Sequence, residues 1–174
     1  MSLETLKQNL RTVPDFPKKG ILFYDITTLL KNPACFAELA DRICEIYQDK
    51  GITKVVGVES RGYIMGSVIA ARLGAGFVPV RKAGKLPAEV YGDSCDMEYG
   101  SSQFEIHRDA ISPDDVVLIH DDLLATGGTI AAAARLVGKN SPKKVYYNCI
   151  IELLGLEGRK NFPAGTEITT ILQL

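Results

Sequence analysis

Two adjacent carboxylates stand before a loop of small residues in the segment HDDLLATGGT, residues 120–129. Residues 125–129 carry little side-chain bulk, so their backbone N–H groups can approach a ligand closely. Together with the start of a helix, such groups favour an anion, most simply a phosphate. Asp121 and Asp122 cannot contact that phosphate favourably, and they suit hydroxyl donors or a metal ion instead. A ribose 5-phosphate fits both halves of the segment, with its phosphate in the loop and its hydroxyls on the acids.

The elements that must position this segment include one clear helix. It is predicted over residues 32–51, where Asn32 can cap the first turn, Pro33 suits that turn and Gly51 can end the helix. Apolar residues recur along it at helical spacing, which indicates one buried face. Further helices are expected over residues 63–73 and 127–137.

Short apolar runs between these helices predict strands. They cover residues 54–58, 77–80, 116–119 and 145–151. Pro79 makes the second of them an edge strand or ends it early, because proline cannot donate to a strand ladder. Residues 88–106 indicate an exposed hairpin or a mobile loop. Strands that alternate with helices predict an α/β fold with a central, mostly parallel sheet, and segment 120–129 follows a strand at the edge where such sheets bind ligands.

Composition narrows the class of protein. The 174 residues are enough for one domain with a sizeable core. A formal net charge of -1 gives no field that would draw the chain to nucleic acid or to an anionic membrane. No apolar run is long enough to cross a bilayer and the N-terminus has no signal-peptide pattern, so we expect a cytoplasmic protein. The four cysteines show no CxxC spacing, which argues against a zinc site.

The segment VVLIHDDLLATGGT, residues 116–129, resembles the 5-phosphoribosyl-1-pyrophosphate (PRPP) motif of type I phosphoribosyltransferases. Its DDLLATGGT form is most similar to the adenine phosphoribosyltransferases. Further blocks follow that family's order and spacing over nearly the whole chain. They are FPKKGILFYDIT at 16–27, GVESRGYIMG at 57–66, VRKAGKLP at 80–87, and MEYG with FEIHRDAI at 97–111.

The resemblance implies one phosphoribosyltransferase domain over residues 1–174, with a small N-terminal hood at about 1–30 and a flexible catalytic loop at 88–106. The implied reaction converts adenine and PRPP to AMP and pyrophosphate in purine salvage, through an oxocarbenium-like transition state. The implied cofactor is Mg²⁺, held through PRPP without a direct protein ligand, or bridged by water to Asp121 or Asp122. A homodimer is implied as well, with Arg81 reaching the partner's site.

The family's roles for segment 120–129 agree with the interpretation of its residue types. Asp121 and Asp122 would bind the ribose. The 5-phosphate would lie on Ala125, Thr126, Gly127, Gly128 and Thr129.

The leaving pyrophosphate needs cations, and two blocks supply them. By resemblance, Ser60 and Arg61 bind pyrophosphate in a loop that often contains a cis peptide, and Arg61 is a catalytic candidate. Arg81, Lys82 and Lys85 form a basic run, which in most proteins is only a solvated face. Here that run can neutralise pyrophosphate, because Arg suits bidentate contacts and Lys suits point-charge contacts.

Glu98, in the block Met97-Glu98-Tyr99-Gly100, aligns with the family's proposed general acid for the purine N7. The carboxyl of a closed loop can have its pKa raised enough for that task. Tyr99 would help to position substrate. Without the resemblance, an exposed loop carboxylate would be the better interpretation of Glu98.

The resemblance assigns adenine recognition to the hood. The base would meet the backbone near Leu22 and an apolar cover from Phe23 and Leu123. Two positions depart from the family's pattern. Tyr24 stands where many members carry Arg, so it could stack on the base or merely pack. His120 stands where an apolar residue is usual, and we expect it to pack rather than to catalyse.

Two other functions are weighed against this one. The first is a phosphoribosyltransferase for another nucleobase, but hypoxanthine–guanine relatives have a different pattern around the acids and orotate relatives lack the ESRGYIMG and GKLP combination. The second is a non-catalytic PRPP-sensing regulator. Such regulators tend to carry a DNA-binding domain and a basic surface, and 174 residues with a net charge of -1 show no sign of either.

Overall fold

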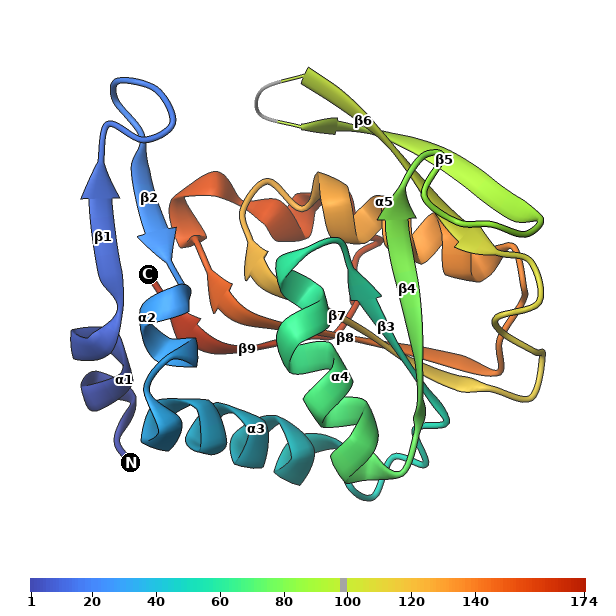
Figure 1. Cartoon of the computed structure of the whole chain (residues 1–174), viewed down its shortest axis with the longest axis horizontal. Coiled ribbons are helices and arrows are strands. Elements are labelled where there is room, and N and C mark those ends of the chain that lie inside the picture. Colours follow the sequence, from blue (N-terminus) through green and yellow to red (C-terminus); the bar gives the residue numbers. More distant parts are fainter. Residues whose placement is uncertain (98–99) are drawn as a thin grey trace. The chain divides into compact units, whose positions relative to one another are not determined.

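A computed structural model of the chain describes residues 1–97 and 100–174 (Figure 1). It contains two compact units, Met1–Arg42 and Ile43–Leu174. The single domain over residues 1–174, with its hood and its flexible loop, stays a prediction.

The N-terminal unit contains a small antiparallel sheet and short helices. Its elements are α1 (Leu3–Asn9), β1 (Arg11–Pro14), β2 (Leu22–Asp25), α2 (Thr27–Leu30) and the start of α3 (Pro33–Tyr47). Ser2 caps α1, because its hydroxyl accepts the backbone N–H of Thr5 at 3.1 Å. Asp25 joins the elements by accepting from Thr27 and Arg11, which lower the pKa of Asp25 to about 2.

The second unit contains a seven-stranded sheet in the order β5-β6-β4-β3-β7-β8-β9. The strands β4, β3, β7, β8 and β9 pair in parallel, while β4 with β6 and β6 with β5 are antiparallel. The mostly parallel sheet confirms the predicted fold class. The strands of this unit are β3 (Lys54–Val58), β4 (Gly76–Lys82), β5 (Val90–Met97), β6 (Gly100–His107), β7 (Val116–Leu124), β8 (Lys144–Glu152) and β9 (Ile168–Gln173). Its helices are α4 (Arg61–Leu73) and α5 (Gly128–Gly138), with the short 3₁₀ helices η1 (Leu154–Leu156) and η2 (Gly158–Asn161).

The order of the strands decides where a ligand can bind. From β3 the chain crosses through α4 to β4 on one side, and from β7 it crosses through α5 to β8 on the other. Because such crossovers are right-handed, the two helices cover opposite faces of the sheet, as Figure 1 shows. The carboxyl ends of β3 and β7 therefore lie side by side where the winding changes direction, which is the place where open α/β sheets bind ligands.

Burial of apolar side chains holds the sheet between its helices. On α5, Ile130, Ala133 and Leu136 are at most 1% exposed. They belong to the same buried cluster as Val117 and Ile119 of β7. Removing such side chains from water is the main stabilising contribution to a fold of this kind. The site at the end of β7 is thus attached to the rigid core.

Most predicted elements differ from the structure by one or two residues at an end. The outcomes for β7, β4 and α3 are the most informative. The strand expected to end near Ile119 continues to Leu124, because β8 pairs with it as far as the register Leu124–Glu152. Pro79 does not end β4: it faces β3 in parallel pairing, and β6 pairs with β4 only at Arg81 and Lys82. The strand is therefore an edge over its first half. Helix α3 ends at Tyr47, before Gly51.

Residues 88–106 fall mainly in the antiparallel hairpin of β5 and β6, as one of the two predicted alternatives has it. Apolar and polar residues do not alternate clearly in this segment, so the sequence pattern alone does not identify the strands. They are defined by the pairing of β5 with β6. The sequence did not predict the strands β1, β2 and β9 or the helices α1 and α2.

Candidate active site

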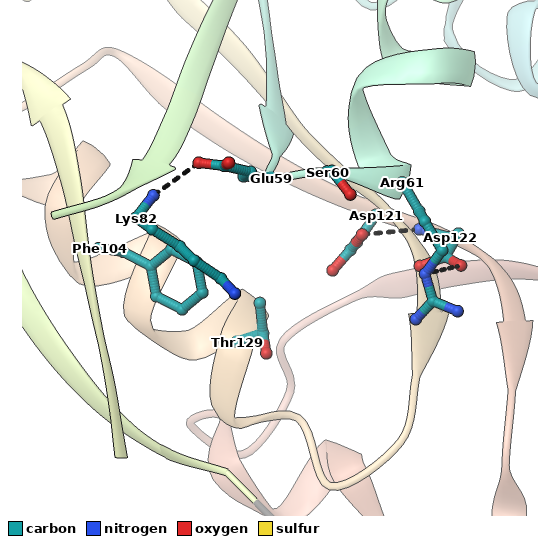
Figure 2. Close-up of a pocket in the computed structure, with 8 residues that line it drawn as sticks. All are labelled: Glu59, Ser60, Arg61, Lys82, Phe104, Asp121, Asp122 and Thr129. Atoms are coloured by element: carbon teal, nitrogen blue, oxygen red, sulfur yellow. Dashed lines mark hydrogen bonds and ion pairs between the residues drawn. The ribbon is translucent and has the colours of Figure 1, made fainter. Parts of the chain in front are cut away.

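A cavity of about 240 Å³ opens at the carboxyl ends of β3 and β7 (Figure 2). It lies within the unit Ile43–Leu174. The side chains that line it come from the strands β4, β6 and β7, the helices α4 and α5, and the loop after β3. They are Glu59, Ser60, Arg61, Lys82, Phe104, Asp121, Asp122 and Thr129.

The two predicted ribose-binding acids lie within β7 and not in the loop after it. Figure 2 shows the carboxylate of Asp121 pointing into the cavity. Asp122 also lines the cavity, but it is only 4% exposed and points in a different direction, so that its Oδ2 lies 3.0 Å from Nε of Arg61. This arrangement follows from the alternation of side chains along a strand. One acid thus faces a ligand while its neighbour meets a cation at the start of α4.

The electrostatics of the pair favour ligand binding. Burial raises the pKa of Asp121 well above its usual value, and the adjacent carboxylate of Asp122 raises it further. Burial also raises the pKa of Asp122, while Arg61 opposes that shift. Carboxylates withheld from water gain most when a ligand supplies hydroxyl donors, because their oxygens otherwise bear an uncompensated desolvation cost.

The predicted phosphate loop, residues 125–129, connects β7 to α5. Gly127 has φ of 84°, a left-handed conformation that L side chains rarely adopt, and it caps α5. A Cβ at this position would lie 2.2 Å from the carbonyl oxygen of Gly158, so only glycine fits. Thr129 lies in the first turn of α5 and lines the cavity. The loop and the helix N-terminus together present backbone N–H groups to an anion.

The loop after β3 forms the opposite wall. Its Glu59–Ser60 peptide is cis, as the resemblance implied. Glu59 accepts the backbone N–H of Lys82 at 2.8 Å and lies 3.4 Å from Nε of Arg81. These contacts lower the pKa of Glu59, the Lys82 N–H most of all. The end of β4 is thereby held beside the end of β3.

The structure separates the three cations of the basic run. Lys82 lines the cavity, and Figure 2 shows its side chain extending toward the side where Thr129 lies. Arg81 lies beside the cavity, and its Nη1 donates to the carbonyl oxygen of Lys85 at 3.2 Å. Lys85 is exposed and is not part of the lining.

Two residues of the cavity were missed by sequence reasoning. Phe104 is 2% exposed and closes one side of the cavity, but an aromatic residue in a strand normally indicates core packing. Glu59 stands in the ESRG block, where only Ser60 and Arg61 were assigned. Neither residue type carries a signal that could have placed it here without the fold.

His120 is a packed residue, as expected. It is fully buried in β7, and its Nδ1 lies 2.9 Å from Oδ1 of Asn148. The amide of Asn148 donates to Thr169, so its oxygen accepts from an Nδ1–H tautomer of His120. Burial lowers the pKa of His120 to about 4, which keeps the ring neutral at physiological pH.

The predicted adenine-binding residues fall in both units. Leu22, Phe23 and Tyr24 lie on β2 of the N-terminal unit, where Leu22 is 47% exposed and the ring of Phe23 packs edge-on against Phe16 at 5.1 Å. Leu123 lies on β7. The predicted loop residues Glu98 and Tyr99 lie outside the described residues.

Comparison with known proteins identifies the family. The model of the phosphoribosyl transferase domain matches residues 25–165. The chain is 62% identical to the adenine phosphoribosyltransferase of Phocaeicola vulgatus over 174 residues, which is 100% of both chains. The chain belongs to the adenine phosphoribosyltransferases. Members of this family are transferases of purine salvage, and so is this chain.

Two solved structures agree with that assignment. The adenine phosphoribosyltransferase of Rhodothermus marinus is 52% identical and superposes with a TM-score of 0.92, over 99% of this chain and 98% of its own. The APRTase of Giardia lamblia, solved with 9-deazaadenine, is 41% identical with a TM-score of 0.95, over 100% and 98%. Both superpositions extend over the small N-terminal sheet as well as the large one.

The described residues add two facts about metals and membranes. Among residues 1–97 and 100–174, no group of three or more His, Cys, Asp and Glu side chains is arranged to hold a metal ion. None of the helices in this part of the chain has the length and apolarity that crossing a membrane requires.

Proposed function

We propose that the cavity binds PRPP and that the chain transfers its phosphoribosyl group to adenine, giving AMP and pyrophosphate. The observation that carries this proposal is that acidic and basic side chains line the same cavity. Asp121 faces the cavity from β7 beside the N-terminus of α5, while Arg61 and Lys82 approach from α4 and β4. A ligand with hydroxyls between a phosphate and a pyrophosphate fits these charges.

Each part of PRPP then has a proposed partner. The 2- and 3-hydroxyls of the ribose donate to Asp121 and Asp122, and the 5-phosphate accepts from residues 125–129. The pyrophosphate meets Ser60, Arg61 and Lys82, with Arg81 and Lys85 nearby. The lining of the cavity supports the contacts of Ser60, Arg61, Lys82 and the two acids.

The same groups would lower the barrier to reaction. Breaking the bond at the anomeric carbon leaves a cationic sugar and a pyrophosphate rich in negative charge. Carboxylates near the ribose stabilise the first, and the cations of Arg61 and Lys82 stabilise the second. Asp121, Asp122 and Arg61 are already held by contacts with one another, so these groups need little reorganisation in the transition state.

Mg²⁺ fits this site as a partner of PRPP. The oxygens of Asp121 and Asp122 are ligands of the kind that Mg²⁺ prefers, and Mg²⁺ commonly uses one or two carboxylates, waters and substrate phosphates. When bound, the ion would neutralise charge on the leaving pyrophosphate. Asp121, which points into the cavity, is the acid proposed to reach the ion through a bridging water.

Adenine recognition is proposed for Leu22, Phe23, Tyr24 and Leu123, with Glu98 as general acid for N7 and Tyr99 positioning substrate. The 9-deazaadenine bound by the Giardia lamblia relative supports adenine as the base. Glu98→Gln tests the acid, because it should lower kcat more than it raises the KM for adenine. An unchanged kcat would remove Glu98 from the mechanism.

A homodimer in the cytoplasm completes the proposal, with Arg81 serving the partner's site. The side chain of Arg81 is 35% exposed beside the cavity, which is compatible with such a reach. Mixing an Arg81→Ala protein with an inactive Asp121→Asn/Asp122→Asn protein tests it. Activity should return in mixed dimers if Arg81 acts across the interface, and should stay absent if it acts within its own chain.

The experiment that tests the whole proposal measures pyrophosphate release. Purified protein, PRPP and magnesium would be mixed in turn with adenine, hypoxanthine, guanine and orotate. Release with adenine alone is expected, and it would show that Tyr24 can stand where Arg is usual. Release with another base would keep the PRPP chemistry and overturn the adenine assignment.

A further inference from the structure

The phosphate loop rests on a second segment that sequence reasoning did not single out. This segment is η2 (Gly158–Asn161), which follows the end of β8. Gly158 lies directly behind the loop: a Cβ at Gly158 would come within 2.3 Å of the carbonyl oxygen of Ala125. The side-chain amide of Asn161 donates to the carbonyl oxygen of Thr126. The carbonyl of Thr126 is therefore held by a hydrogen bond from behind, and the preceding carbonyl lies against Gly158.

Fixing these carbonyls also fixes the donors of the loop. In a planar trans peptide the N–H points away from the C=O. When the carbonyl of Thr126 turns toward Asn161, the N–H of Gly127 must turn to the opposite side. Gly127 cannot relax by changing its φ freely, because the carbonyl of Gly158 lies against it. The segment thus determines the direction in which the loop presents its donors.

An ion pair between a buried carboxylate and an arginine that is 43% exposed holds this segment in place. Glu152, the last residue of β8, is 3% exposed. Arg159, between Gly158 and Asn161, donates to both of its oxygens, from Nε at 2.6 Å and from Nη2 at 2.7 Å. Thr170 and Gln173 of β9 donate to the same carboxylate at 3.0 and 3.3 Å. Such bidentate pairs fix geometry as well as adding energy.

We propose that the Glu152–Arg159 ion pair and Asn161 are positioning residues for the 5-phosphate site, acting through the backbone of residues 125–129. This inference rests on the proposed function, because it needs the phosphate of the substrate to lie in that loop. Glu152 sits one strand away from the acids of β7, at the register Leu124–Glu152, so the pair anchors the loop to the sheet at the end where the loop begins. None of these side chains lines the cavity.

The experiment compares two ligands that divide the substrate. Ribose 5-phosphate uses the loop, and inorganic pyrophosphate uses the opposite wall. Asn161→Ala and Arg159→Gln should each weaken ribose 5-phosphate binding by about 10-fold, the effect of losing one hydrogen bond. Pyrophosphate binding should change less than about 2-fold on the same basis. The KM for PRPP should rise while kcat changes little, as for lost uniform binding.

Matched variants separate positioning from general stability. Arg159→Lys keeps one contact to Glu152 and should recover part of the ribose 5-phosphate affinity. Lys160→Gln changes the neighbouring residue, whose side chain is 73% exposed and pairs only with Glu157 among the described ion pairs, and it should bind both ligands normally. Asn161 is exposed, so Asn161→Ala should fold normally even if Arg159→Gln does not.

The outcomes distinguish the inference from the function on which it rests. Wild-type protein that fails to bind ribose 5-phosphate would overturn the proposed function, and this inference with it. Normal wild-type binding with unchanged affinity in Asn161→Ala and in a folded Arg159→Gln would overturn only the inference. Equal weakening of ribose 5-phosphate and pyrophosphate would overturn it too, because it would indicate a general loss of structure.

Discussion

The two walls of the cavity are built differently. On the β7 side, Asp122 is buried, burial raises the pKa of Asp121, and the phosphate loop lies against Gly158 and accepts a hydrogen bond from Asn161. On the β4 side, Lys82 and Lys85 are exposed, and Arg81 has 35% of its side chain exposed. We call the β7 side the rigid wall, because buried contacts hold it, and the β4 side the solvated wall, because its cations are exposed. This contrast suits a reaction in which the ribose phosphate is held while pyrophosphate leaves.

The largest effect should follow from removing both acids of the rigid wall. Asp121→Asn/Asp122→Asn should weaken PRPP binding about 100-fold or more, because two charge-assisted hydrogen bonds are lost where water cannot replace them. Isothermal titration with PRPP and magnesium measures this. Asp114→Asn, at an exposed carboxylate, is the control and should bind normally. Unchanged PRPP affinity in the double variant would show that the ribose lies elsewhere.

Substitutions of the cations on the solvated wall should weaken ligand binding less, and by different amounts at different residues. Lys82→Gln should weaken pyrophosphate binding by about 10-fold, since Lys82 lines the cavity. Lys85→Gln should change it by no more than about 2-fold, because an exposed charge outside the lining is screened by solvent and salt. Titrations at two salt concentrations measure both. Equal effects of the two variants would contradict the placement of Lys82 as the cation of the cavity.

The acids of the two walls should also have opposite effects on the stability of the folded protein. Burial raises the pKa of Asp121, so the folded state is penalised as pH rises above 3.8, the usual value. Asp121→Asn removes that penalty and should raise the melting temperature of the ligand-free protein at pH 8 by about 2–4 °C. The gain should shrink as pH is lowered and disappear below 3.8, where the wild-type acid is protonated in both states. Thermal unfolding across this range is the measurement, and a gain independent of pH would show that the buried charge is not its cause.

Glu59 on the other wall should show the opposite sign and the smallest effect. Its pKa is lowered by the Lys82 N–H and by Arg81, so it stabilises the fold above pH 4.5, and the contribution is lost as pH falls through the folded pKa. Glu59→Gln should lower the melting temperature at pH 7 by about 1–2 °C, as for a partly exposed pair. The difference should disappear in acid. If Glu59→Gln raised the melting temperature instead, the acids of the two walls would not differ in their effect on stability.

Much of the site was predictable because its chemistry is local in sequence. The small residues at 125–129 and the acids before them indicate a phosphate and a ribose without any fold, since backbone access and charge depend on neighbouring residues. The α/β class was also predictable, because apolar runs and helical patterns alternate along the chain and each pattern depends only on neighbouring residues. The assignments of Glu98 and Tyr99 depend on family resemblance alone and lie outside the described residues.

Other features could be decided only by tertiary structure. Whether β7 ends at Ile119 or Leu124 depends on its pairing with β8, and the role of Phe104 depends on β6 lying beside β4. The meeting of Arg61 with Asp122, 3.0 Å apart across the ends of two elements, results from strand order at the point where the sheet changes its winding. The sequence by itself thus determined which ligand chemistry each segment offers. The tertiary structure decided which segments share one cavity, because only packing brings residues distant in the chain within bonding distance.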